Sequence, residues 1–292
     1  PQEQTYPSVT AVAGGFVVAW QGRGEDDSSG IFGRLFDLNG VQQSDDFIIN
    51  DTLSSTQSQV RLTSMASGGF AAIFSGNGVG DNSGTFLTTF DANGNRVVNE
   101  TLANAIASGT QSEPDITELA NGKLVVTYRT GSDIKAQIFN NDGSAFSDAI
   151  TVADTSDSEY QPKVAALDNG GFVVTYTDSN DTSNAGVFAQ IYDANGQAVG
   201  ELLRVNEQTS GAQYEPDVTA LVGGGFAVSY LDSNNPYSIF VQQFDNDGNI
   251  VDGPKRAETN NVNGNYEPSI TALNNGGFAV TWTGYNTEPD QA

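Results

Sequence analysis

The sequence predicts an all-β protein, a β-propeller of about six four-stranded blades, and two observations carry this prediction. First, the phrase GGFVVTY at residues 170–176 returns in closely similar form along the whole chain of 292 residues. Aligned on Phe16, Phe70, Leu124, Phe172, Phe226 and Phe278, the copies lie 54, 54, 48, 54 and 52 residues apart. Second, each period holds four short strand-like runs. A period near fifty with four strands per unit is typical of propeller blades.

The fourth unit shows the four runs most clearly. They cover residues 163–167, 171–177, 186–193 and 201–206, and they are rich in Val, Phe, Tyr, Ile and Thr. Polar and apolar residues alternate roughly with period two, as in a strand that is buried on one face. No stretch of the chain shows a helical stripe, so we expect almost no helix.

Turn residues between the runs support the same register. The turn DNGG at 168–171 and its counterparts supply residues that tolerate positive φ between the first two strands of each unit. A second turn, such as YDANG at 192–196, joins the third and fourth strands and fits a type I turn that ends in a left-handed glycine. Both connections predict antiparallel hairpins.

We expect a single propeller domain over residues 1–292. Its repeat units cover about 1–53, 54–107, 108–155, 156–209 and 210–261, with an incomplete sixth unit at 262–292. The chain therefore holds five complete repeats and half of another. Because closure of a propeller removes exposed sheet edges, we expect the parent polypeptide to continue, or a partner to supply the missing strands.

Composition limits the chemistry. The chain has 36 acidic and 11 basic residues, a net charge of -25, and neither Cys nor His. This charge predicts no nucleic-acid partner and favours cations. The lack of His and Cys leaves carboxylates, Tyr, Lys and Ser for any catalysis. No apolar run reaches 18 residues, so we expect no membrane insertion.

The loops between the second and third strands contain candidate calcium ligands. Calcium takes six to eight oxygen ligands, which Asp, Asn, Ser and backbone carbonyls provide. The candidate ligands are Asp178, Asn180, Asp181, Asp26 and Asp27. Plain polar turns are the alternative interpretation. The turn carboxylates Asp37, Asp91, Asp193 and Asp245 are also possible calcium ligands. For them, however, the stronger expectation is that each Asp bonds to the backbone of its own turn.

The start of the first strand in several units carries a candidate glycan site. The motif YEP and its variants place Tyr160, Tyr214 and Tyr266 beside Glu113, Glu215 and Glu267. A tyrosine ring stacks on the face of a sugar, and a carboxylate accepts bonds from its hydroxyl groups. The alternative is that the rings pack between blades and the carboxylates are solvated.

The whole chain resembles the tandem repeats of very large secreted bacterial proteins described as adhesin-like and associated with repeat-in-toxin export. The resemblance rests on QPKVAALDNGGFVVTYTDSNDTSNAGVFAQIYDANGQAVGELLRVN at 161–206 and its echoes in the other units. It implies an extracellular or cell-surface setting and a propeller-like array. It implies no agreed catalytic residues. The calcium nonapeptide GGxGxDxUx is absent.

Three functions follow from these patterns. We expect first a non-catalytic adhesin or matrix-like module, not an enzyme, whose acidic loops bind cations, glycans or other protein subunits. The first alternative is a carbohydrate-active propeller enzyme, a glycoside hydrolase or lyase that uses carboxylates near the central channel. The second is a filament subunit completed by β-strand addition.

Overall fold

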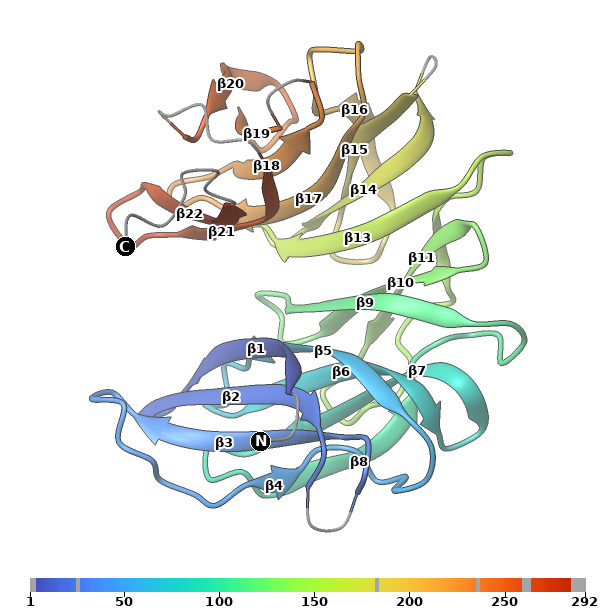
Figure 1. Cartoon of the computed structure of the whole chain (residues 1–292), viewed down its shortest axis with the longest axis vertical. Helices are drawn as coiled ribbons and strands as arrows, with labels where there is room; N and C mark the ends of the chain where they lie inside the picture. Colours follow the sequence, from blue (N-terminus) through green and yellow to red (C-terminus); the bar gives the residue numbers. More distant parts are fainter. Residues whose placement is uncertain (1–3, 25–26, 182–183, 235–236, 259–263, 285–292) are drawn as a thin grey trace, which may run out of the picture. The chain divides into compact units, whose positions relative to one another are not determined.

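The computed structural model describes residues 4–24, 27–181, 184–234, 237–258 and 264–284, and within them it contains strands and no helix (Figure 1). The strands are β1 Thr5–Val12, β2 Gly15–Gly22, β3 Gly30–Asp37, β4 Phe47–Ile48, β5 Gln57–Ser64, β6 Phe70–Gly78, β7 Asp81–Phe90, β8 Arg96–Leu102, β9 Gln111–Glu118, β10 Leu124–Thr130, β11 Asp133–Phe139, β12 Ile150–Ala153, β13 Glu159–Ala166, β14 Phe172–Asp181, β15 Asn184–Tyr192, β16 Ala198–Arg204, β17 Gln213–Ala220, β18 Phe226–Asp232, β19 Ser238–Phe244, β20 Ile250–Arg256, β21 Asn265–Ala272 and β22 Phe278–Gly284. In this part of the chain no helix is long and apolar enough to cross a membrane.

The strands form five four-stranded antiparallel sheets and one two-stranded sheet, each from consecutive strands. The two-stranded sheet is β21–β22, so the expected half repeat at the end of the sequence has its two strands. In the fourth sheet the observed strands β13 to β16 overlap all four predicted runs. The all-β class and the four-stranded repeat are therefore confirmed.

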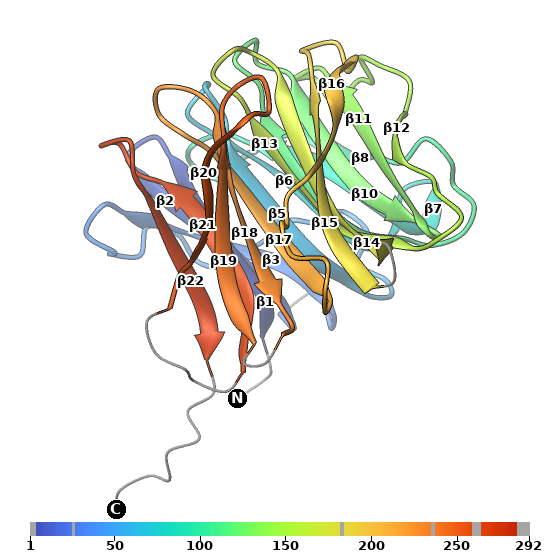
Figure 2. The same ribbon diagram turned by 90° about the horizontal axis from the view of Figure 1, so that it is seen from above.

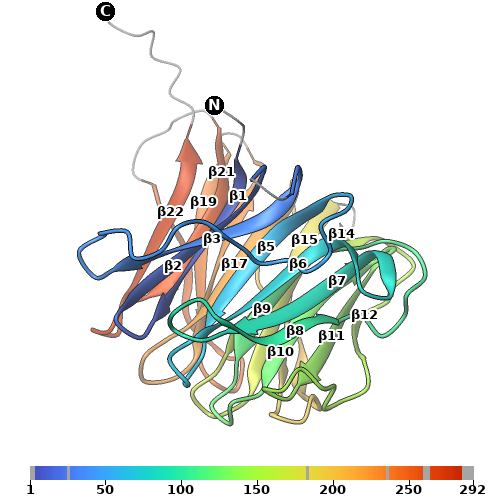
Figure 3. The same ribbon diagram turned by 90° about the horizontal axis from the view of Figure 1, so that it is seen from below.

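The chain divides into two compact units, residues 1–131 with 135–151, and residues 132–134 with 152–292. In the first unit the first strands of neighbouring sheets, β1, β5 and β9, lie side by side (Figure 3). In the second unit β13, β17 and β21 do the same (Figure 2). Each unit therefore has a layer of adjoining first strands, and a feature that recurs on these strands meets its copy on the next sheet.

Aromatic pairs hold the second and third strands together in four of the sheets. Phe226 of β18 stands opposite Phe244 of β19, and the two rings stack with centroids 4.9 Å apart. Phe172 and Tyr192 repeat this pair in the fourth sheet at 5.0 Å. Both phenylalanines of the fifth sheet are buried and contact residues of the fourth sheet, so the rings fill the space between sheets. The phrase that recurs in the sequence is thus the core of each blade.

The predicted turns are also present. In the turn after β15, the NH of Gly196 donates to the Asp193 carbonyl at 3.0 Å, and Gly196 has φ +84°. The Asp193 carboxylate accepts from the backbone NH of Asn195 and of Gln197, at 2.8 and 2.9 Å. These bonds lower the pKa of Asp193. The turn aspartates Asp37, Asp91 and Asp245 accept the same pair of backbone bonds, so this carboxylate serves the turn.

Candidate functional site

Every first strand carries a β-bulge at the same place. In β17 the residue pair between Tyr214 and Asp217 stands opposite a single residue of β18. The first bulged residue has a left-handed backbone in all six sheets: Tyr6, Gln59, Glu113, Gln161, Glu215 and Glu267, with φ between 51° and 58°. Such a conformation costs roughly 1–3 kcal/mol for a residue other than glycine, and it persists only where neighbouring contacts hold it.

Side chains of the bulged residues hold the next bulge in place. Gln59 Oε1 accepts the backbone NH of Glu113 at 2.9 Å in the first unit. In the second unit Gln161 Oε1 accepts the NH of Glu215 at 2.9 Å, and Glu215 Oε2 accepts the NH of Glu267 at 2.7 Å. Each bond joins one first strand to the next. The same position can therefore hold Gln or Glu without change of this contact.

Tyrosines surround the bulges of β17 and β21. Tyr237, from the loop before β19, packs against Tyr266 with ring centroids 5.5 Å apart. Tyr214 is half-buried beside the Tyr237 hydroxyl and the Glu215 carboxylate, and desolvation with these neighbours raises its pKa to about 12. Tyr237 remains 37% exposed. The result is an aromatic surface that is partly open to solvent and has carboxylates at its border.

The two carboxylates at this border differ in environment. Glu215 is half-buried, whereas Glu267 is exposed. Burial raises the pKa of Glu215, the bond from the Glu267 NH lowers it in part, and the Glu267 charge raises it again. Asp217, two residues further along β17, accepts the hydroxyl of Ser269 at 3.0 Å and the NH of Ile270 at 2.8 Å. Because burial is the largest of the effects on its pKa, Glu215 holds its proton to a higher pH than an ordinary glutamate.

The predicted glycan residues divide between the two units. Tyr214, Tyr266, Glu215 and Glu267 come together in the second unit as described. Tyr160 lies on β13 of the same unit, half-buried and opposite Thr177. Glu113 lies in the first unit, where it forms an ion pair with Arg129 at 3.4 Å. Glu113 therefore has a cationic neighbour in place of the tyrosines.

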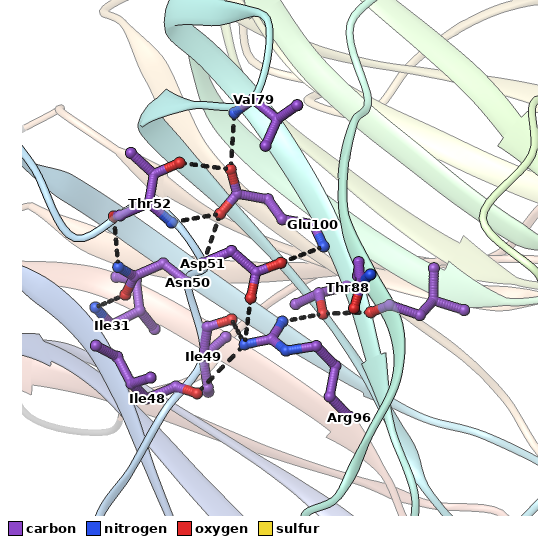
Figure 4. A network of polar contacts seen from close by, with 12 residues as sticks. Ile31, Ile48, Ile49, Asn50, Asp51, Thr52, Val79, Thr88, Arg96 and Glu100 are labelled. Carbon is purple, nitrogen blue, oxygen red and sulfur yellow. Dashed lines mark hydrogen bonds and ion pairs between the residues drawn. The ribbon is translucent and has the colours of Figure 1, made fainter.

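Asp27, a predicted calcium ligand, lies in a closed polar network between the first two sheets. Its exposed fraction is 2%, and its carboxylate accepts the Ser29 NH and the Asn50 amide, both at 2.9 Å. Figure 4 shows Asn50 beside Asp51, which forms an ion pair with Arg96 at 3.1 Å. Protein groups thus occupy both Asp27 oxygens. Asp26 lies outside the described residues.

The other predicted calcium ligands lie in the fourth sheet. Asp178 Oδ1 accepts the Asn180 NH at 2.9 Å, and the Asn180 side chain donates to Asp157 at 3.2 Å. Asp181 is buried and paired with Arg204. Among the described residues, no group of three or more acidic side chains converges as a metal site requires.

Sequence reasoning missed two residues of interest. Tyr237 lies in a loop whose letters, LDSNNPYS, indicate only a variable polar loop. Glu159 opens β13 and is completely buried. An alignment of the repeats finds it, because SxxQ at 54–57, 108–111 and 210–213 becomes SxxE at 156–159.

Comparison with known proteins shows the fold. No family model matches the chain, and no curated protein matches it. A solved structure of a protein of unknown function from Dyadobacter fermentans has a TM-score of 0.65 at 12% identity, over 92% of this chain and 87% of the other. An α-L-arabinanase of Penicillium chrysogenum complexed with arabinobiose has 0.65 at 15%, over 97% and 89%. The NanB sialidase of Streptococcus pneumoniae has 0.62 at 11%, over 98% of this chain and 66% of the sialidase. At these identities the likeness shows a β-propeller fold alone.

These comparisons correct two predictions. We expected a non-catalytic adhesin or matrix-like module and no enzyme. Similar structures that carry a functional name include a sialidase, an arabinanase and an arabinofuranosidase from Fusarium graminearum, and these three are not adhesins. The prediction was wrong because it treated the repeats as equivalent, whereas the flanking residues of each bulge vary while the bulge recurs. The carbohydrate-active alternative is the one that the comparisons favour.

Proposed function

We propose that this protein is a carbohydrate-active β-propeller, a glycoside hydrolase whose sugar site is the surface formed by Tyr214, Tyr237 and Tyr266 with Glu215 and Glu267. The observation that carries the proposal is the meeting of two carboxylates and three tyrosines at adjoining left-handed bulges. Tyrosine rings offer a flat face for a pyranose or furanose ring, and carboxylates bind its hydroxyl groups.

The carboxylates suit unequal roles. Hydrolysis of a glycoside commonly uses one carboxylic acid, which protonates the leaving oxygen, and one carboxylate, which acts as base or nucleophile. Glu215 has the raised pKa that a proton donor needs, because it is half-buried and next to a second acid. Glu267 is exposed and suits the second role. Histidine, which this chain lacks, is not required.

The charge of the chain favours neutral glycans. Its net charge of -25 repels sulfated, uronic and sialylated chains over the distance at which substrates approach. We therefore expect neutral pentose or hexose polymers to be the better substrates. As parts of the same proposal, the six sheets are the blades of one propeller, and the protein acts outside the cell on polysaccharide.

The test is release of reducing sugar or nitrophenol by the purified chain from a panel of neutral and anionic glycosides and polysaccharides. Tyr266→Ala serves as the site variant, and Phe146→Ala, which truncates an exposed aromatic in the first unit, serves as the matched control. We expect turnover of a neutral substrate by the native protein and by the control, with at least a tenfold loss in Tyr266→Ala. Absence of turnover on the whole panel, or equal turnover by both variants, contradicts the proposal.

A further inference from the structure

The buried side chain that opens the first strand has the same function in three of the six sheets. Gln57, Gln111 and Gln213 are at most 1% exposed. The amide of each donates to the carbonyl of the serine three residues earlier, at 3.3 Å for Ser54, 3.0 Å for Ser108 and 3.1 Å for Ser210. An amide NH₂ thus closes the loop that leads into each of these strands. A carboxylate has no hydrogen to donate in its place.

The fourth sheet has Glu159 at this position, and the loop before it differs. In the other three loops the residue after the serine has a left-handed backbone: Ser55, Gly109 and Gly211. Asp157, the corresponding residue, is not among the positive-φ residues of the described chain. The Thr155 hydroxyl donates to Glu159 Oε1. Glu159 Oε2 is buried and has no hydrogen-bond partner among the described residues.

Other oxygen atoms surround Glu159. Asp178 stands directly opposite it in the ladder between β13 and β14. The Glu159 NH donates to the Ser132 carbonyl at 2.8 Å, which brings the start of β11 and Asp133 close. The loops before β13 and at the end of β14 are joined by Ser158 and Ser179, which exchange bonds of 3.0 and 2.9 Å. The Asp178 and Asp133 charges both act on Glu159.

We infer that Glu159 and Asp178 bind a divalent cation, with calcium the best match, where the start of β13 lies beside the end of β14. A buried ionised oxygen without a donor costs several kcal/mol unless a positive charge or a proton satisfies it. Calcium accepts a small number of carboxylates when carbonyl and hydroxyl oxygens and water complete its shell. The site therefore requires no group of three acids, and it is independent of the proposed glycosidase site.

A proton on Glu159 is the competing way to satisfy the buried oxygen. Burial raises the pKa of Glu159, and the Asp178 and Asp133 charges add to this effect, whereas the Thr155 hydroxyl lowers it in part. Tyr176, on β14, also faces this carboxylate. A protonated Glu159 predicts stability that falls as the pH rises and that calcium does not change. A bound cation instead predicts stability that rises when calcium is added.

The experiment measures the melting temperature of the full chain at pH 7.5 with EDTA or with 5 mM calcium. The variant Glu159→Gln introduces the residue found at this position in three other sheets, Gln57, Gln111 and Gln213, and should fold. Asp193→Asn removes a turn carboxylate of the same sheet and is the control. We expect calcium to raise the melting temperature of the native chain and of the control by roughly 4–8 °C, and to leave Glu159→Gln nearly unchanged.

Calorimetric titration with calcium chloride provides the second measurement. We expect one site in the native chain and in Asp193→Asn, with at least a tenfold weaker affinity in Glu159→Gln. Equal calcium responses in all three proteins overturn the inference. So does a native chain that ignores calcium but gains stability relative to Glu159→Gln as the pH falls from 7.5 to 5.5, since this identifies a proton on Glu159.

Discussion

The bulges of β9 and β17 have the same backbone and different chemistry. Glu113 and Glu215 have φ values of 54° and 56°, and each backbone NH donates to a glutamine of the preceding first strand. In β9 the flanking residues are Ser112 and, across the ladder, Arg129. In β17 the same two places hold Tyr214 and Leu231. The exchange of Ser for Tyr and of Arg for Leu at these two places removes the arginine partner of the carboxylate and puts a tyrosine beside it.

The repeat supplies the backbone geometry, and the flanking residues supply the chemistry of each bulge. The left-handed bulge presents a carboxylate at the edge of the first-strand layer in either unit. The residue across the ladder gives Glu113 a cationic partner, whereas burial and the Glu267 charge raise the pKa of Glu215. A chemical site can therefore arise on one sheet without a change in the fold.

The largest expected effect separates these two glutamates. Glu215→Gln keeps the oxygen that accepts the Glu267 NH, as Gln59 and Gln161 do in their sheets, but removes the acid. We expect kcat/KM on a neutral glycoside to fall by about 10² or more, the usual contribution of a positioned general acid. Glu113→Gln should stay within twofold. Equal loss in both variants contradicts the role of Glu215 as the acid.

The second prediction tests the hydrogen bonds between bulges. Gln161→Ala and Gln59→Ala each remove the acceptor of one backbone NH, that of Glu215 or Glu113. We expect each variant to lose about 1–2 kcal/mol of unfolding free energy in urea denaturation, the cost of an unsatisfied buried donor. Only Gln161→Ala should also lose activity, because the bond from the Glu215 NH to Gln161 no longer holds the backbone of the proposed acid in place. Activity lost in Gln59→Ala alone contradicts this prediction.

The fold could be predicted from sequence far better than the site. The copies of GGFVVTY and the glycine turns fixed the strands, because each strand and turn depends on residues close in sequence. The bulge was not predicted, since neither Gln59 nor Glu215 is a residue that favours a left-handed backbone. At Glu113, Glu215 and Glu267 the backbone NH bonds to a side chain of the neighbouring sheet, which is distant in sequence. Tyr237 was missed for a similar reason, as its partner Tyr266 is a ring from another sheet.

At Glu159, in contrast, the exchange of residues is visible in the sequence but its consequence is not. The motif SxxQ is visible in the printed sequence, and so is its change to SxxE at 156–159. What the sequence lacks is the burial of that side chain, which alone makes the change from amide to carboxylate costly. The excess of acids predicted cation binding, which stays a prediction, and the loop aspartates Asp27 and Asp181 bond to protein groups.

The third prediction uses the raised pKa of Glu215. Because its pKa in the folded chain lies above that in the unfolded chain, the protonated acid favours folding at low pH, and this contribution is lost as the pH rises through the folded-state value. Glu215→Gln cannot titrate. We therefore expect the stability of the native chain relative to Glu215→Gln to decrease from pH 4 to pH 7 in urea denaturation at each pH. A constant difference contradicts the environment described for Glu215.

The smallest effect concerns the bulge of the first sheet. Tyr6 has φ +51° and is 53% exposed, so it adopts a strained backbone with little burial in return. Tyr6→Gly relieves the strain of roughly 1–2 kcal/mol, but glycine increases the entropy of the unfolded chain by about 0.5–1 kcal/mol. We expect a net gain of about 0.5 kcal/mol in unfolding free energy. Glu113→Gly should instead lose stability, because it also removes the ion pair with Arg129. A gain in both variants would mean that strain outweighs side-chain contacts at every bulge, and the two units would then differ less than their residues suggest.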